Sequence, residues 1–368
     1  MRVDLRQVGL TLVAPVLAVV FAIVVTTIIL IAAGDPVGDV WATIFSAPKP
    51  RNLVNIINSG SVLYLSALAA AVGFRMNLFN IGVDGQYRIA AFVAAWVAGE
   101  AWLPGILNVL LALVVAMLVG AMWAGIAGIL RVTRGVSEVI STIMLNAIAT
   151  ALVAFMLRKV AVGGSNNITT TPIPESSRLE GFDIIPGAVN TVYTLALVAV
   201  LAGIFYWALL GKTRFGFSLR ATGQSESAAV AAGISVGRMI VYSMLISGAI
   251  AGLIGMPLLF GDSHSYGVTF QPGLGFAGIA VALLGRNHPV GIAFGALLFA
   301  FLNEQANPLQ IRAGVSDEIV NIIQGVIVLS VVIAYEVVRR YNNAAEQRKV
   351  AEQLAESRGH GPTTEEVA

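Results

Sequence analysis

Residues 75–91 read RMNLFNIGVDGQYRIAA, and this polar segment lies between two apolar runs, residues 56–74 and 89–99. A polar, glycine-containing segment between membrane-length runs is costly in lipid unless it lines a cavity or the protein interior. We therefore predict that it contributes to a translocation path or to an inner gate. The candidate residues are Asn77, Asn80, Asp84 and Gln86.

The composition indicates a membrane protein. Of the 368 residues, 57% are hydrophobic and only 11% are charged, against about 25% charged residues in soluble domains. The apolar runs are long and uninterrupted, which predicts an all-α polytopic fold. The net charge of +2 gives little support to nucleic-acid binding. With no cysteine and three histidines, we expect no metal site, and no motif indicates a cofactor.

Ten apolar segments predict about ten transmembrane helices, some of them short or broken. They are residues 10–33, 56–74, 89–99, 103–130, 136–157, 191–210, 239–260, 273–285, 290–302 and 319–338. The first is too long for the apolar core of a signal peptide, so we predict that it is retained. With both termini in the cytoplasm, most of the 22 lysines and arginines fall on the cytoplasmic side, as the positive-inside rule requires.

This topology predicts a transmembrane domain, residues 1–338, and a charged cytoplasmic tail, residues 339–368. Within the domain, residues 158–190 form an extracytoplasmic loop and residues 211–238 a cytoplasmic loop. The segments also permit an inverted repeat of two five-helix halves, which pairs the short third segment with the short, glycine-rich eighth. In secondary transporters, paired short segments of this kind mark the substrate site.

The cytoplasmic loop contains a predicted short helix. Residues 226–232, ESAAVAA, are strong helix formers, and Gly233 is placed to end the helix. Such a helix either docks on a soluble partner or is an ordinary amphipathic loop helix. The nearby sequence Gly211-Lys212-Thr213 is not a phosphate-binding loop, because Tyr206 stands where that motif requires glycine. We therefore expect no ATP hydrolysis by this chain.

Polar residues also line the start of the fifth apolar segment. Glu138, Ser141, Thr142 and Asn146 have the spacing of one helix face. This face either borders a translocation path or a partner subunit, or it forms interhelical hydrogen bonds. Asp84 has the same two interpretations, with Arg75 and Arg88 as candidate ion-pair partners.

Four motifs together resemble one family. FNIGVDGQ, GVSEVISTIMLN, LRATGQSESAAVAAGI and GIAVALLGRNHPVGI are similar to permease subunits of ABC importers for nucleosides and simple sugars, a group related to branched-chain amino-acid permeases. The resemblance implies an ATPase subunit, a second permease subunit of the same or a related chain, an extracytoplasmic substrate-binding protein, and a bacterial plasma membrane.

The resemblance also implies a coupling helix with an EAAxxxG pattern, which docks on the ATPase subunit. Ser227 occupies the glutamate position of this pattern, and Glu226 precedes it. The implied coupling residues are Arg220, Glu226, Ser227, Ala228, Ala229 and Gly233.

The sequence thus predicts a non-catalytic permease subunit of an ATP-driven importer for nucleosides or a related simple sugar. An ion-coupled secondary transporter or a channel for a small polar solute is the alternative. The few charged residues within the apolar segments argue mildly against ion coupling. A membrane-bound enzyme is a third class, and no catalytic set of residues supports it.

Overall fold

The computed structural model describes residues 5–162, 168–268, 270 and 272–359. It divides into two compact units, one formed by Met1–Val40 with Asp317–Ala368 and the other by Trp41–Ser316. The helices confirm the predicted all-α class, and each of the ten predicted segments falls on one of them. These helices are α1 Leu5–Ala33, α3 Pro50–Phe74, α4 Val83–Glu100, α5 Gly105–Arg134, α6 Glu138–Val160, α7 Ala196–Lys212, α10 Val236–Gly252, α12 Leu274–Leu284, α13 Pro289–Glu304 and α15 Glu318–Gly359.

The helices differ in their capacity to cross a bilayer. Among the described residues, 6 helical segments are long and apolar enough to cross, or 7 if α7 and α8, Arg214–Gln224, form one span bent by 73°. At 1.5 Å per residue the 11 residues of α12 reach only about 16 Å, half of the roughly 30 Å hydrocarbon core. The expectation of short and broken helices is thus met, while the count of ten crossings and the cytoplasmic termini stay predictions.

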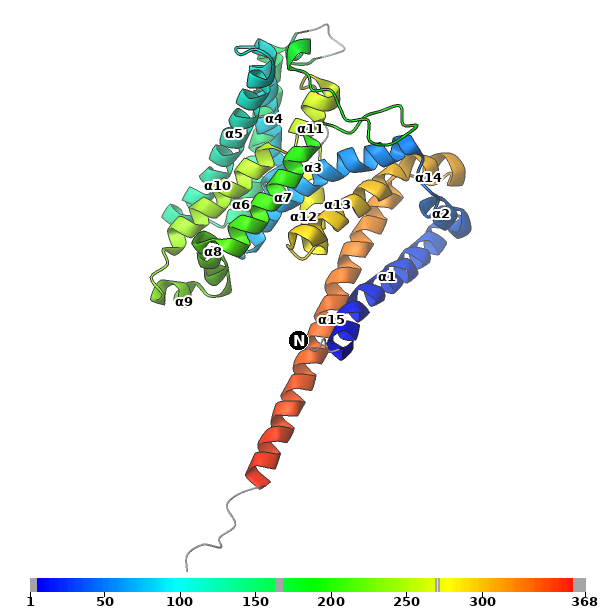
Figure 1. Ribbon diagram of the computed structural model, residues 1–368, viewed down its shortest axis with the longest axis vertical. Coiled ribbons are helices and arrows are strands. Elements are labelled where there is room, and N and C mark those ends of the chain that lie inside the picture. The colour runs from blue at the N-terminus through cyan, green and yellow to red at the C-terminus, as the bar shows by residue number, and fades with distance from the viewer. Residues whose placement is uncertain (1–4, 163–167, 269, 271, 360–368) are drawn as a thin grey trace, which may run out of the picture. The chain divides into compact units, whose positions relative to one another are not determined.

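Helix α3 is the centre of the larger unit. It packs against α7, α10, α12 and α13, and α4 packs against α5 and α6 (Figure 1). Helices α5 and α10 meet through glycines: a Cβ at Gly120 would lie 2.2 Å from the carbonyl oxygen of Gly248. Small residues let helix backbones approach closely in membrane proteins. The helices that surround α3 and α4 leave most residues of these two helices buried.

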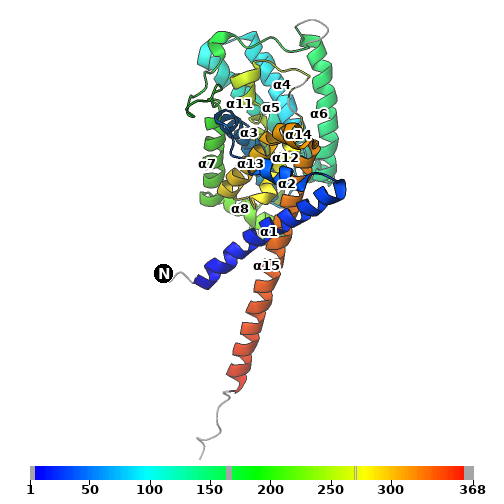
Figure 2. The ribbon, with the colours of Figure 1, turned by 90° about the vertical axis from the view of Figure 1, so that its right-hand side faces the viewer.

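In the smaller unit, α1 and α15 pack against each other (Figure 1, Figure 2). The sequence predicts a change from span to tail at residue 339, but α15 continues without a break for 42 residues, about 63 Å. Glu336 bonds Arg339 at 2.7 Å and Arg340 at 2.8 Å, at helical i,i+3 and i,i+4 spacing. The tail sequence is therefore helical up to Gly359, and residues 360–368 lie outside the described residues.

Two segments expected as loops contain helices. Helix α2, Val37–Ile44, interrupts the expected loop 34–55, and α14, Ala306–Ala313, interrupts the expected loop 303–316. The buried amide of Gln305 donates to the carbonyl oxygens of Ile44 and Ser46, both at 3.3 Å. The α13–α14 junction is therefore held by contacts with a segment distant in the sequence.

Three expected boundaries also move. Helix α4 begins at Val83 and not at residue 89, so Asp84, Gln86 and Arg88 are helical. The sixth segment becomes helical only at Ala196, because residues before it are in loop contacts that include an antiparallel bridge between Phe182 and Val192. The seventh breaks after α10 and continues as α11, Met256–Leu258, and a π-turn, η2, at Leu259–Ser263.

Candidate functional site

The turn between α3 and α4 contains the first candidate residue, Asn77. The backbone N–H groups of Met76 and Leu78 return to the carbonyl of Gly73 at 2.9 and 3.0 Å. Between them, Asn77 has a φ of 58° and an exposed side chain. Asparagine tolerates this left-handed conformation better than most residues. The turn geometry therefore explains the residue type at position 77, and it separates Asn77 from the buried candidates that follow.

Asn80 and Gln86 form a buried pair of amides, which we call the amide lock. The Asn80 Nδ2 donates to Gln86 Oε1 at 3.0 Å and the Gln86 Nε2 donates to Asn80 Oδ1 at 2.9 Å. Asn80 also donates to Ser247 Oγ at 2.8 Å and accepts from the N–H of Gly82 at 3.0 Å. Ser247 in turn donates to the carbonyl of Ala69 at 2.6 Å. The two donor hydrogens and both lone pairs of the Asn80 amide are thus used inside the protein.

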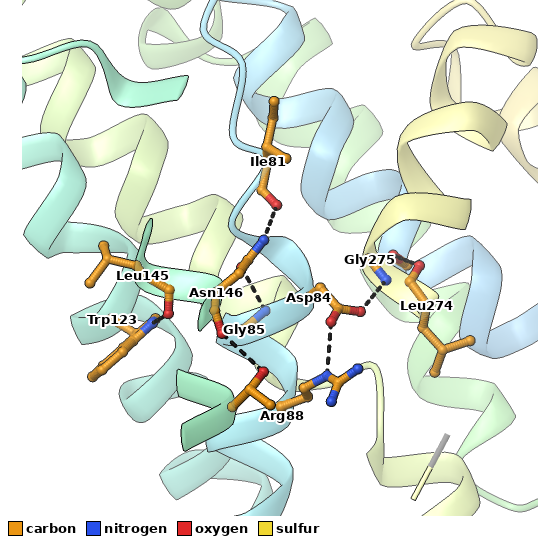
Figure 3. A network of polar contacts seen from close by, with 11 residues as sticks. Ile81, Asp84, Gly85, Arg88, Trp123, Leu145, Asn146, Leu274 and Gly275 are labelled. Carbon is orange, nitrogen blue, oxygen red and sulfur yellow. Dashed lines mark hydrogen bonds and ion pairs between the residues drawn. The ribbon is translucent and has the colours of Figure 1, made fainter. Parts of the chain in front are cut away.

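Asn146 of α6 binds both sides of the α4 start (Figure 3). Its Nδ2 donates to the carbonyl of Ile81 at 2.9 Å, and its Oδ1 accepts from the N–H of Gly85 at 2.8 Å. A Cβ at Gly85 would lie 2.8 Å from the Asn146 Cα. Glycine at position 85 therefore permits the close approach of α4 and α6 that these hydrogen bonds need.

Asp84 joins the N-terminal ends of α4 and α12 (Figure 3). Its Oδ2 lies 2.8 Å from Arg88 Nε, and its Oδ1 accepts from the N–H of Gly275 at 3.3 Å. A carboxylate is favoured where the free N–H groups of a first helical turn point. Of the two expected partners, Arg88 forms the ion pair, whereas Arg75 donates to the carbonyl of Asn287 at 2.8 Å. The two short segments paired in the sequence are thus in direct contact.

The polar face of α6 divides into two roles. Ser141 and Thr142 donate to carbonyls of their own helical turn, at 2.9 and 2.7 Å. Glu138 is buried, accepts from the N–H of Phe79 at 3.4 Å and pairs with Arg131 in the last turn of α5. Sequence reasoning missed Arg131, although a basic residue in the last turn of one helix and an acid in the first turn of the next indicate such a pair.

The predicted coupling segment forms α9, Glu226–Ala231, one residue shorter than expected. The Ser225 Oγ accepts from the N–H of Ala228 at 3.2 Å as an N-cap. Gly233 has a φ of 77° and ends the helix, with the N–H of Ile234 bonded to the Ala229 carbonyl at 2.9 Å. The predicted end of the helix is confirmed.

Side chains of this segment point in two directions. Ala229 is buried, whereas Glu226, Ser227 and Ala228 are exposed. Arg220 of α8 does not share that exposed surface, because its guanidinium donates to the carbonyl of Leu210 at the end of α7. Arg220 therefore holds the bend between α7 and α8.

The loop after η2 pairs with the extracytoplasmic loop of the prediction. The N–H of Ile173 donates to the carbonyl of His264 at 2.8 Å. Burial lowers the pKa of His264 and the nearby Arg178 lowers it further, against the opposing effect of Asp262. Burial and Arg178 thus favour the neutral form of the imidazole.

The sequence matches one protein family over most of its length. Residues 52–332 match the family described as branched-chain amino acid transport system / permease component. The chain belongs to this family. The permease is a multi-pass plasma-membrane protein, and the family resemblance predicted from the motifs is confirmed. Permease subunits of ABC transporters are normally non-catalytic, and membership implies an ATPase partner and a binding protein.

Three relatives match most of the permease. It is 35% identical over 332 residues to the guanosine ABC transporter permease protein NupP of Bacillus subtilis, covering 89% of this chain and 94% of that one. It is 32% identical over 342 residues to the glucose ABC transporter permease protein TsgB13 of Haloferax volcanii, with 89% and 88% covered. It is 32% identical over 330 residues to the nucleoside ABC transporter permease protein NupB of Lactococcus lactis, with 87% and 90% covered.

A solved inward-facing ABC transporter of metal-chelate type aligns over 89% of this chain and 97% of that one. The TM-score is 0.43 and the sequence identity is 16%.

Proposed function

We propose that the permease forms the translocation path for nucleosides or a related simple sugar in an ATP-driven importer. The observation that carries this proposal is the identity of 32% to 35% with three relatives named for guanosine, nucleoside and glucose transport. These relatives are covered over nearly their whole length, which supports a shared mode of action. The named substrates are neutral and rich in hydroxyl groups.

The polar residues at the starts of α4 and α6 are proposed to act as an inner gate or a structural lock. The amides of Asn80 and Asn146 are engaged with protein groups, and Asp84 and Glu138 are ion-paired. Such groups hold α4 against its neighbours and have little capacity left for cargo. Together with Gln86, they are better suited to a structural lock than to a substrate site.

We further propose that the ATPase subunit docks on α9. Its exposed residues Glu226, Ser227 and Ala228, with the turn at Gly233, are the docking surface, while the buried Ala229 and the internally bonded Arg220 position it. A second permease subunit, the same or a related chain, completes the path. The predicted topology also places segments 34–55 and 262–272 outside, so the substrate-binding protein is proposed to dock on the surface available in 34–55, 158–190 and 262–272, of which residues 163–167, 269 and 271 lie outside the described part of the chain. ATP hydrolysis belongs to the partner ATPase.

The test is uptake by proteoliposomes that contain the permease, its second permease subunit, its ATPase and its binding protein. Labelled guanosine, uridine, glucose and leucine are supplied separately, with ATP or ADP inside. We expect ATP-dependent uptake of a nucleoside or of glucose, and none of leucine. Uptake that persists without the ATPase and collapses with the proton or sodium gradient would establish a secondary transporter instead. Uptake of leucine alone would refute the substrate class.

A docking variant tests the role of α9. Ala229 is buried and Gly233 has a positive φ, so Ala229→Glu together with Gly233→Glu disrupts the segment. We expect loss of ATP-dependent uptake with normal membrane insertion. Wild-type uptake by this variant would contradict docking at α9.

A further inference from the structure

Arg131 at the end of α5 reaches two carboxylates from two different helices. One terminal nitrogen pairs with Glu138 of α6, and the other lies 3.8 Å from Glu226 Oε1 of α9. Gly135, with a φ of 67°, ends α5 and lets the chain turn into α6. One guanidinium therefore connects the helix proposed for docking with the start of α6, and we call this set of contacts the Arg131 bridge.

The two contacts of the Arg131 bridge differ in strength. The Glu138 side chain is 7% exposed, whereas the Glu226 side chain is 61% exposed. An exposed pair at this distance is weak and screened by salt, while a buried carboxylate depends on its partner for charge compensation. Glu226 can therefore leave Arg131 readily, and Glu138 cannot.

The buried end of the Arg131 bridge continues to the amide lock. Glu138 Oε1 accepts from the N–H of Phe79, and Phe79 directly precedes Asn80. The α8–α9 segment touches the same turn at a second place, because a Cβ at Gly223 would lie 2.7 Å from the carbonyl oxygen of Arg75. A chain of polar contacts that starts at α9 and a close approach of α8 thus both lead to the turn before α4.

We propose that Arg131 is a positioning residue that transmits the position of α9 to the turn at Phe79 and Asn80. This inference rests on the proposed docking of an ATPase subunit at α9. When the docked partner displaces α9, the distance between the carboxylate of Glu226 and the guanidinium of Arg131 changes. Arg131 then moves, and the carboxylate of Glu138 moves with it. The hydrogen bond from Glu138 to the Phe79 N–H then changes, and with it the turn that orients the start of α4.

A single thiol in this cysteine-free chain reports on the turn. Phe79 is 46% exposed, and its hydrogen bond to Glu138 uses the backbone, so Phe79→Cys leaves that bond in place. The Phe79→Cys permease is assembled with its second permease subunit and its ATPase in nanodiscs and labelled with a fluorescent maleimide. The rate of labelling is compared between ADP and a non-hydrolysable ATP analogue. We expect the rate to differ at least about fivefold between the two nucleotides.

Three single variants and one double variant in the Phe79→Cys background separate transmission from stability. Arg131→Gln and Glu226→Gln should each reduce the difference to less than about twofold, and their combination should have no further effect. Arg131→Lys keeps a positive charge for Glu138 but lacks the two-nitrogen fork that reaches both carboxylates. We expect wild-type thermal stability from Arg131→Lys and the same loss of response.

The matched control is Arg134→Gln, which removes an exposed charge from the same helical turn. It should keep the full response. A full response in Arg131→Gln or Glu226→Gln, with intact complexes on gel filtration, would refute the proposal that the Arg131 bridge transmits the position of α9. If Arg131→Gln does not fold, the exposed Glu226→Gln and the charge-preserving Arg131→Lys decide the question.

Failure of this inference differs from failure of the proposed function. If the Phe79→Cys parent does not assemble with the ATPase, docking at α9 and the Arg131 bridge are both refuted. If the parent assembles and transports but shows no response to nucleotide, only the Arg131 bridge is refuted. If the parent responds and transports, and Arg131→Gln responds equally, only the Arg131 bridge is refuted.

Discussion

Replacement of Asn80 by alanine should destabilise the permease without altering its recognition of substrate. Asn80 makes four hydrogen bonds, two with Gln86 and one each with Ser247 and Gly82. A buried neutral hydrogen bond in a membrane protein contributes about 0.6–1 kcal/mol. Asn80→Ala should therefore lower the free energy of unfolding by about 2–4 kcal/mol, and Gln86→Ala, which removes two of these bonds, by about 1–2 kcal/mol.

The double variant provides the sharper measurement. The two bonds between Asn80 and Gln86 are shared, so the combined effect should fall short of the sum by about 1–2 kcal/mol. Unfolding is followed by SDS titration in mixed micelles, and transport is measured in proteoliposomes. Asn77→Gly is the matched control, because its side chain is exposed and glycine accepts its positive φ. Additive effects, or a raised KM for transport with unchanged stability, would refute the amide lock.

Three further predictions concern packing, pH and topology. Gly275→Ala places a Cβ 2.2 Å from the backbone nitrogen of Asp84 and should destabilise the protein by at least about 2 kcal/mol in SDS titration, whereas Gly211→Ala, with nothing within 4 Å of its Cβ, should be neutral. Folding lowers the pKa of His264 below its ordinary value of 6.5. The contribution of His264 to stability is therefore complete above pH 6.5 and is lost as the pH falls through the lower pKa of the folded state. His264→Gln should flatten this part of the melting-temperature profile, and an unchanged profile would show that His264 is not its cause. If the predicted topology holds, a membrane-impermeant maleimide applied to cells should label Val189→Cys in the extracytoplasmic loop, and labelling from the same side at Val230→Cys would refute it.

Long helices and helix ends could be predicted because their causes are local. An apolar run such as residues 103–130 needs no distant partner to be helical in lipid, and Gly233 marks the end of α9 by its own capping chemistry. The contacts of Glu138 and Asn146 with other helices were one of two interpretations that their spacing allowed. Local pattern alone does not distinguish a face toward a path from a face toward another helix.

The parts of the fold and of the candidate site that could not be predicted depend on contacts between residues far apart in the sequence. Helix α14 follows a junction in which Gln305 bonds carbonyls about 260 residues away, at Ile44 and Ser46. The meeting of Asp84 with Gly275 spans 191 residues. No single-sequence pattern assigns such partners, so their roles became visible only when the helices were placed side by side.

The meeting of α4 and α12 constrains how this protein can evolve. The first turns of α4 and α12, each at the positive end of its helix dipole, both lie at the carboxylate of Asp84. A side chain at position 275 would collide with the backbone of residue 84. Loss of the acid would leave Arg88 and both helix ends as neighbouring positive charges. Asp84, Arg88 and Gly275 therefore depend on one another physically, and we expect a change at one position to require compensation at another.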